Sequence, residues 1–166
     1  MSANRKPRKA YRPRPALVTP LTYGASTAML LQLGLRDRAA IDAIMSGDGD
    51  IDQLRRVEAA CIAAIYLHRA GTANPAQHQV DLESLAEMGP TLTACAQAIR
   101  DISDRHERTG RVLPSGPDRA QLVALIDCLD ALREAMPRRM WNNAYEEAIR
   151  HPTLRIPRPQ PEREAA

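Results

Sequence analysis

The residues best suited to nucleophilic or metal chemistry in this chain are three cysteines, and they are widely spaced. Structural metal sites usually take their ligands from local pairs such as Cys-x-x-Cys, and no such pair is present. Cys61, Cys95 and Cys128 instead fall on the apolar stripes of three different predicted helices. Free cysteines in such positions behave as small buried hydrophobes. We therefore expect free thiols, no bound metal and no cofactor.

The histidines offer the second route to catalysis. His68 and His106 continue the apolar stripes near the C-terminal ends of their predicted helices, where an imidazole can be half-buried or can complement the helix dipole. A catalytic pair of His106 with Asp101, Asp104 or Glu107 is the enzymatic alternative. The sequence contains no Gly-rich phosphate loop and no nucleophile elbow. We therefore predict a protein without enzymatic activity.

Three alternating carboxylates, Asp48, Asp50 and Asp52, resemble the opening of a calcium loop. Such a loop needs glycine at its sixth position and glutamate at its twelfth, and this chain has Gln53 and Ala59 there. Acids are also favoured at the start of a helix, where they complement the helix dipole. The segment is thus interpreted as a capped helix start.

Six positive charges lie within residues 1–14, where there is no acid. Residues 15–149 carry 13 basic and 18 acidic side chains, and residues 150–166 carry four arginines and two glutamates. A basic, Pro-rich arm can neutralise phosphates without a fixed fold, which predicts mostly non-specific contact with nucleic acid. The alternatives are a solubilising tail, an arm that folds back on its acidic body, and an arm that docks on an acidic protein. The predicted nucleic-acid-binding residues are Arg5, Lys6, Arg8, Lys9, Arg12 and Arg14.

A second candidate surface surrounds the single tryptophan. Trp141 follows Arg138 and Arg139, and Tyr145 lies one helical turn later. Tryptophan and arginine are favoured anchors at interfaces, so the candidates for partner binding are Arg138, Arg139 and Trp141. The alternative is that Trp141 and Tyr145 pack the last helix onto the rest of the protein.

The element that must position these residues is a central helix from Asp50 to Gly71. Asp50 and Gln53 have capping-box spacing, and Gly71 is interpreted as the stop. No charge occurs from Ala59 to Leu67, and a helix that is apolar on every side must be covered on every side. The absence of phenylalanine and the scarcity of aromatic residues also favour packed helices over sheets.

The other apolar stripes predict four or five further helices. Pro90 interrupts one stripe whose register nevertheless continues, which favours one kinked or two coaxial helices over a chain reversal. We predict an all-α fold, a single irregular or orthogonal bundle of five or six helices over residues 20–150. An extended basic arm (1–19) and an extended Pro-rich tail (151–166) flank it. The further helices are expected at Thr22–Leu35 (closed at Gly34), Arg36–Met45, Leu82–His106 (capped by Asp81, stopped at Gly110), Pro117–Met136 and Arg138–Arg150.

Composition also bounds the compartment. An odd number of scattered cysteines favours a reducing environment, and no apolar run approaches the length of a membrane span. Residues 16–27 contain Pro20, Gly24 and four hydroxyl side chains, which argues against a signal peptide. We expect a cytoplasmic protein. Helical stripes at alternating steps of three and four residues also suit pairing between chains, so a homodimer is plausible.

Several short motifs resemble those of a family of small, uncharacterised proteins encoded in proteobacterial phages and prophages. The motifs are Arg12-Pro13-Arg14-Pro15, the segment from Arg36 to Gly71, and Thr109-Gly110-Arg111 followed by Gly116-Pro117 and a Leu-rich helix. The resemblance covers residues 8–136 and implies a mobile-element origin and the cytoplasm of a bacterial host. It implies no activity and no site residues.

Two functions are consistent with these features. The first is a phage-type accessory protein that contacts nucleic acid, or a nucleoprotein complex, through its basic arm. The second is a protein-interaction module that inhibits a host defence complex, as anti-CRISPR proteins do, with an acidic helical body that presents phosphate-like charge.

Overall fold

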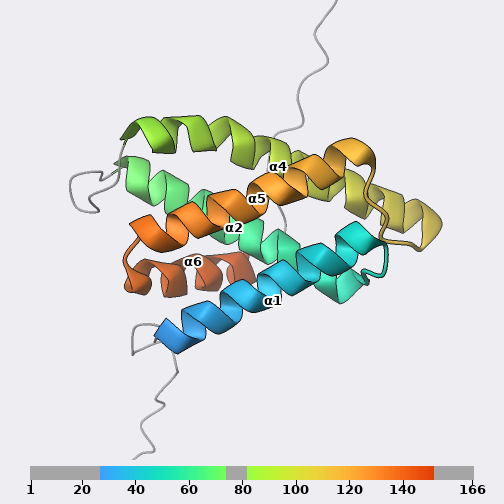
Figure 1. The fold of residues 1–166 in the computed structure, drawn as a ribbon, viewed down its shortest axis with the longest axis horizontal. Coiled ribbons are helices and arrows are strands. Elements are labelled where there is room, and N and C mark those ends of the chain that lie inside the picture. Colours follow the sequence, from blue (N-terminus) through green and yellow to red (C-terminus); the bar gives the residue numbers. More distant parts are fainter. Residues whose placement is uncertain (1–26, 74–81, 152–166) are drawn as a thin grey trace, which may run out of the picture.

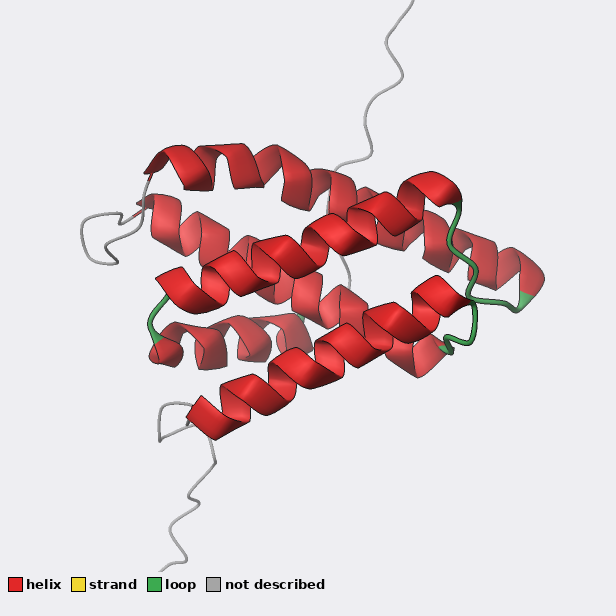
Figure 2. Cartoon of the chain, viewed as in Figure 1, coloured by secondary structure: helices red, strands yellow, loops and turns green. Residues whose placement is uncertain are grey.

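The computed structural model describes residues 27–73 and 82–151, which form five α-helices and no strand. The described part of the chain is thus an all-α bundle, as predicted (Figures 1 and 2). The helices are α1 (Thr27–Ser46), α2 (Ile51–Ala73), α4 (Leu82–Thr109), α5 (Gly116–Ala135) and α6 (Arg138–Arg150).

Helix α2 is the centre of the bundle, because it packs against each of the other four described helices. In Figure 1, α1 and α5 lie on the near side of α2. The predicted capping box starts this helix: the Gln53 amide donates to Asp50 Oδ1 at 2.8 Å, and the Asp50 amide donates to Gln53 Oε1 at 2.8 Å. These bonds satisfy two of the amide groups that the first helical turn leaves without partners.

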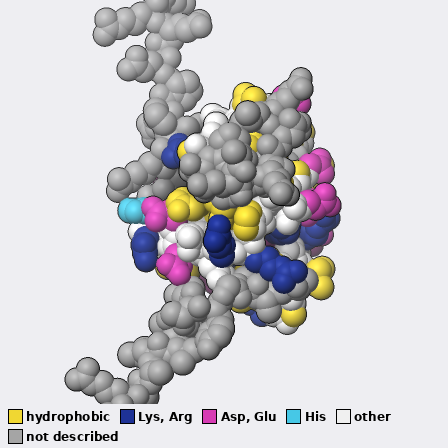
Figure 3. All heavy atoms as spheres, turned by 90° about the vertical axis from the view of Figure 1, so that its left-hand side faces the viewer, with side chains coloured by type: hydrophobic (Ala, Val, Ile, Leu, Met, Phe, Trp, Pro, Cys, Tyr) yellow, Lys and Arg dark blue, Asp and Glu magenta, His cyan; other side chains and the backbone are white. Residues whose placement is uncertain are grey.

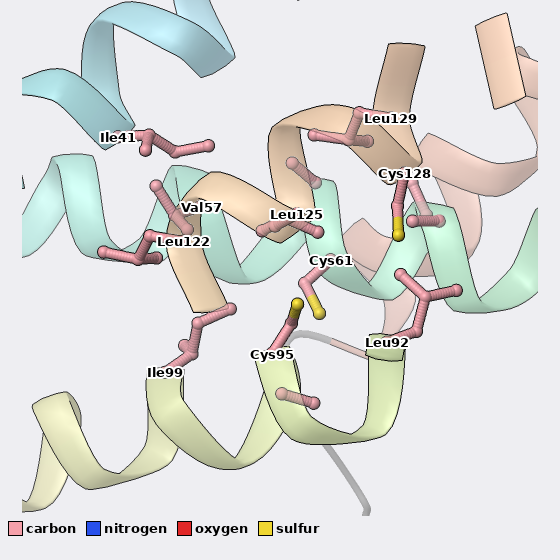
Figure 4. Close-up of a cluster of buried hydrophobic side chains, with 14 of the residues drawn as sticks. Ile41, Val57, Cys61, Leu92, Cys95, Ile99, Leu122, Leu125, Cys128 and Leu129 are labelled. Atoms are coloured by element: carbon pink, nitrogen blue, oxygen red, sulfur yellow. The ribbon is translucent and has the colours of Figure 1, made fainter. Parts of the chain in front are cut away.

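The core lies between α2, α4 and α5 and consists mainly of leucine, isoleucine and alanine. The three cysteines meet here, one from each helix, among leucine and isoleucine side chains (Figure 4). The prediction that they are buried and free is confirmed. The Cys95 thiol donates to the Gln121 carbonyl of α5 at 3.1 Å.

Gly71 does not stop α2, and that prediction was wrong. The helix continues to Ala73, and Gly71 is buried within it. A Cβ at this position would lie 2.3 Å from Met136 Cε and 3.2 Å from Leu85 Cδ1. The glycine therefore permits close packing against the end of α5 and the start of α4, rather than ending a helix.

Gly34 does not separate two helices either. The predicted helices Thr22–Leu35 and Arg36–Met45 are one continuous helix, α1, within the described residues. Gly34 is buried, and the guanidinium of Arg133 lies against it. The predicted end of α1 is confirmed, because Ser46 is its last residue and Gly47 has a φ of +89°.

Helix α4 continues through Pro90, as the unbroken apolar register predicted. The Thr93 hydroxyl donates to the Gly89 carbonyl at 3.0 Å in this region. The predicted cap, Asp81, lies outside the described residues. Gly110 ends the helix as expected: its φ is +70°, and its amide donates to the His106 carbonyl at 2.7 Å.

The structure explains the Thr-Gly-Arg and Gly-Pro motifs around the connection between α4 and α5. Ser115 and Asp118 form a capping box at the start of α5, with Pro117 in its first turn. Asp118 is also paired with Arg105 of α4, and Arg105 Nε donates to the Leu113 carbonyl at 3.0 Å. The Thr-Gly-Arg motif therefore covers the end of α4 and the start of the loop, and Gly-Pro forms the start of α5.

The predicted arm (1–19) and the tail beyond residue 151 lie outside the described residues. None of the helices in 27–73 and 82–151 combines the length and the apolar character that a membrane span needs.

Candidate functional site

A buried carboxylate forms the centre of the most densely connected polar cluster. Asp37 of α1 is four residues before Ile41 and seven before Ile44, so it shares their inward face and is 1% exposed. Arg133 Nη2 of α5 donates to Asp37 Oδ2 at 3.0 Å. The Tyr145 hydroxyl of α6 donates to the same oxygen at 2.6 Å. Three helices thus meet at one carboxylate.

The Arg133 side chain is fixed from several sides. Its Nη1 donates to Asp130 Oδ1 at 3.1 Å, one turn earlier on α5. Its Cζ lies 5.4 Å from the centroid of the Trp141 ring, within the range of a cation–π interaction. On the α1 side, a Cβ on Gly34 would lie only 3.2 Å from Cζ. A side chain at this point of α1 would therefore crowd the guanidinium.

Burial outweighs the favourable partners of Asp37. Desolvation raises the pKa of this carboxyl above its usual value, although Tyr145, Arg133 and Arg56 all act to lower it. Oδ1 accepts no hydrogen bond from the described residues, and Arg56 Nη1 lies 3.9 Å from it. Burial also raises the pKa of Tyr145, with the charge of Asp37 adding to it, so the phenol remains a donor. We call Asp37, Arg56, Arg133, Trp141 and Tyr145 the Asp37 network.

The two groups at the centre of the Asp37 network are withdrawn from solvent or already bonded. Its carboxylate is inaccessible, and its phenol is committed to that carboxylate. What the arrangement achieves is mechanical. It joins α1 to α5 and α6 through charge-assisted hydrogen bonds, which are stronger than neutral ones.

A pocket of about 430 Å³ lies beside the Asp37 network, between α1 and the corner where α5 meets α6. Asp130 is shared here, because it pairs with Arg38 of α1 as well as with Arg133. Figure 3 views this end of the bundle, where basic (dark blue), acidic (magenta) and hydrophobic (yellow) side chains are intermingled. We call the pocket of about 430 Å³ the α1–α5 groove. Its lining residues are Leu30, Leu31, Gly34, Leu35, Arg38, Asp130, Arg133 and Arg138.

The candidate partner-binding residues do not share one surface. Arg138 and Arg139 are exposed, whereas Trp141 is 1% exposed and packs in the core. The Trp141 and Tyr145 rings lie 6.2 Å apart at a tilt of 32°. The structure thus supports the alternative that these two aromatic residues pack the last helix onto the bundle. The six basic residues predicted to bind nucleic acid lie outside the described part of the chain.

The cysteines and histidines are placed for packing. Burial raises the pKa of Cys61, Cys95 and Cys128, that of Cys95 to about 12, so these thiols stay protonated near neutral pH. His68 Nε2 lies 2.8 Å from the Leu85 carbonyl. Asp101, one of the possible partners of His106, accepts from Gln97 instead, at 2.9 Å. In residues 27–73 and 82–151, no group of three or more Cys, His, Asp or Glu side chains is arranged to hold a metal ion.

Sequence reasoning missed the Asp37 network, although one signal was present. A charged residue stood on the apolar stripe of α1, in phase with Ile41 and Ile44. Its partners Arg133 and Tyr145 are 96 and 108 residues away in the sequence, and no periodicity connects them.

Comparison of the chain with protein-family models, with curated proteins and with solved structures finds no match.

Proposed function

We propose that this chain is a phage- or prophage-type accessory binding protein without enzymatic activity, working in the cytoplasm of a bacterial host. Its basic N-terminal arm contacts nucleic acid, alone or within a nucleoprotein complex. The observation that carries the proposal is the sorting of charge along the chain. Residues 1–14 hold six basic and no acidic side chains, whereas residues 15–149 hold 13 basic and 18 acidic ones.

The described helices support this division of labour. Several of their charged side chains are paired with each other: Asp37 with Arg133, Asp118 with Arg105, and Asp130 with Arg38. A net negative body repels phosphate, so attraction to a nucleic acid has to come from the ends of the chain. Contacts made by arginine and lysine on a phosphate backbone carry little sequence information, and we propose mainly non-specific binding.

The test is fluorescence anisotropy with a labelled DNA duplex and a labelled single strand, titrated with the full chain at several salt concentrations. Six phosphate contacts give a slope of log Kobs against log salt of about −5 on duplex and about −4 on single strands. Replacing the six basic residues of the arm with glutamine should abolish binding. The double variant Arg138→Gln, Arg139→Gln removes two exposed charges from the bundle and serves as the matched control, with binding retained.

Two results would refute the proposal. The first is binding that persists after the six replacements. The second is a salt slope near zero, because phosphate contacts that release counterions depend on salt by necessity.

A second function, inhibition of a host complex through the acidic body, is favoured by one surface feature. Asp42, Asp48, Asp50 and Asp52 are all exposed around the connection from α1 to α2. Such carboxylates can occupy a protein surface that normally binds phosphates. A pull-down from host lysate with the full chain, compared with a variant carrying Asp→Asn at 42, 48 and 52, tests this. Recovery of no stoichiometric partner, or equal recovery by both chains, counts against it.

A further inference from the structure

The α1–α5 groove has an apolar wall that the bundle leaves uncovered. Leu31 is 64% exposed and Leu35 is 59% exposed, and they are one turn apart on the same face of α1. They are two of the six exposed large hydrophobic side chains in the described residues. Such clustering at one place, unlike scattered exposed leucines, is typical of an interaction surface.

The opposite side of the groove is basic. Arg38, Arg133 and Arg138 line it together with a single acid, Asp130. Asp130 is shared between Arg38 and Arg133, Arg133 is also paired with the buried Asp37, and Arg138 has no ion-pair partner among the described residues. The groove therefore has an excess of positive charge, although the surrounding body is acidic. A positive site on a negative protein selects an anionic partner and repels a basic one.

The charges also argue against the other available occupants. A symmetric homodimer would place the groove of one copy on that of the other, bringing arginines against arginines. In this chain, residues 1–14 are basic and residues 15–26 contain no acid. Residues 152–166 contain two glutamates, Glu162 and Glu164. The leucine and the isoleucine of this segment are neighbours of arginines, not of these glutamates. Neither end of the chain therefore places a carboxylate within one helical turn of a large apolar side chain.

We infer that the α1–α5 groove docks an acidic amphipathic helix from a separate protein. The partner's leucine or isoleucine side chains pack on Leu31 and Leu35, and its carboxylates face Arg38 and Arg138. The apolar and basic positions of α1, from residue 30 to residue 38, span about 12 Å, or two helical turns. That length suits the recurring mode in which a helix lies in a groove with anchors at i, i+3 or i+4, and i+7. The inference is independent of the basic arm and of nucleic-acid binding.

The experiment uses a fluorescein-labelled model peptide that forms a helix, with leucine at i, i+3 and i+7 and glutamate on both flanks. A second peptide has lysine in place of every glutamate. Fluorescence polarisation with the full chain should show saturable binding of the acidic peptide, and binding of the lysine peptide weaker by about tenfold or more.

Two variants in the groove, Leu35→Gln and Arg138→Glu, should each weaken binding of the acidic peptide by about tenfold or more. Matched controls are Ile149→Gln, which alters the most exposed large hydrophobic side chain at 76%, and Arg119→Glu, which alters an exposed arginine of α5. Neither control residue lines the groove, and both variants should bind like the parent. All four positions are exposed, so unfolding midpoints followed by Trp141 fluorescence should stay close to that of the parent.

Four results would overturn the inference. They are absence of binding, equal binding of the two peptides, equal effects of groove and control variants, and a dimer in light scattering that Leu35→Gln dissociates. The last would assign the groove to a second copy of the chain. If the acidic peptide binds only after deletion of residues 1–26, the N-terminal segment of the chain itself occupies the groove, and the inference fails as well.

Discussion

Replacing Arg133 with methionine should destabilise the bundle much more than replacing Asp37 with asparagine. Methionine retains most of the apolar stem, so the main loss is the charge that faces a carboxylate only 1% exposed. Asp37 would then keep the Tyr145 hydrogen bond and the distant Arg56, whose Nη1 is 3.9 Å from Oδ1. Breaking a buried ion pair from one side costs about 3–5 kcal/mol. That is a large part of the roughly 5–15 kcal/mol that stabilises a typical domain.

After Asp37→Asn, most hydrogen bonds of the Asp37 network can still form. The amide oxygen can still accept from Tyr145 and Arg133, and Arg133 keeps its bond to Asp130 at 3.1 Å. No charge is left buried without a partner. Because desolvation already disfavours the ionised carboxylate, its removal also relieves a cost. The new amide nitrogen takes the place of Oδ1, which has no hydrogen-bond partner among the described residues, so a buried donor is left without an acceptor. That costs about 1–3 kcal/mol before the relief of desolvation is subtracted, so we expect a smaller net loss in the free energy of unfolding than for Arg133→Met.

The pH dependence identifies the cause. The pKa of Asp37 is raised in the folded state, so the folded protein holds this proton more tightly than the unfolded chain. This group's contribution to stability therefore falls as pH rises from its unfolded pKa to its folded pKa. Arg133→Met removes interactions that lower the folded pKa, so the pKa rises further and the fall becomes deeper. The difference in free energy of unfolding between parent and variant should therefore be smaller at about pH 4 than at pH 7. It should shrink by about 1.4 kcal/mol for each unit by which the substitution raises the folded pKa of Asp37 further.

The assay is urea unfolding at several pH values, followed by Trp141 fluorescence and by circular dichroism. The Arg133 contact with the Trp141 ring alters fluorescence but not helix content, so circular dichroism is an independent probe of unfolding. The two signals should give the same midpoint if the bundle unfolds in one step. Arg119→Met, at an exposed arginine of the same helix, is the control and should cost at most about 0.5 kcal/mol. Equal losses for the two arginine variants, or a gap that does not change with pH, would show that Asp37 does not depend on Arg133.

Three further outcomes are expected. In the Arg133→Met background, Gly34→Ala should gain up to about 1 kcal/mol of stability from helix propensity. In the parent it should lose stability, because the new Cβ meets the Arg133 guanidinium at 3.2 Å. A double-mutant cycle by urea unfolding measures this coupling. Gly71→Ala should lower the urea midpoint, because overpacking against Met136 at 2.3 Å costs about 1–3 kcal/mol and exceeds the gain in propensity. The three thiols should react with a thiol reagent such as DTNB far more slowly in the folded protein than in urea, because burial raises their pKa and blocks access.

The helices that sequence reasoning located well are those whose signals are local. The capping box of Asp50 with Gln53 and the stop at Gly110 involve residues within one turn of each other. An apolar stripe also depends on neighbours three and four residues away, which is why the register across Pro90 correctly predicted no chain reversal there; of the two alternatives, one kinked or two coaxial helices, the structure has one helix. Such features need no knowledge of what lies across the core.

The two misread glycines show where local signals stop being sufficient. Gly34 and Gly71 looked like helix ends, as glycine often is, yet each lies inside a helix. Both are there because a side chain from a distant part of the chain, Arg133 or Met136, needs the space of a Cβ. A single sequence contains no information that pairs a glycine with the residue that it admits. The Asp37 network escaped prediction for the same reason.

These distant contacts explain how the first half of α1 is held. Between Ala28 and Arg36, Gly34 is buried and Leu30 packs partly buried against the core, so the apolar burial of this half is limited. Two ion pairs just beyond it, Asp37 with Arg133 and Arg38 with Asp130, also attach the helix. The same two arginines line the α1–α5 groove. Stability of the Asp37 network and the shape of the groove are therefore coupled, and Arg133→Met should weaken binding of the acidic peptide even at temperatures where the bundle stays folded.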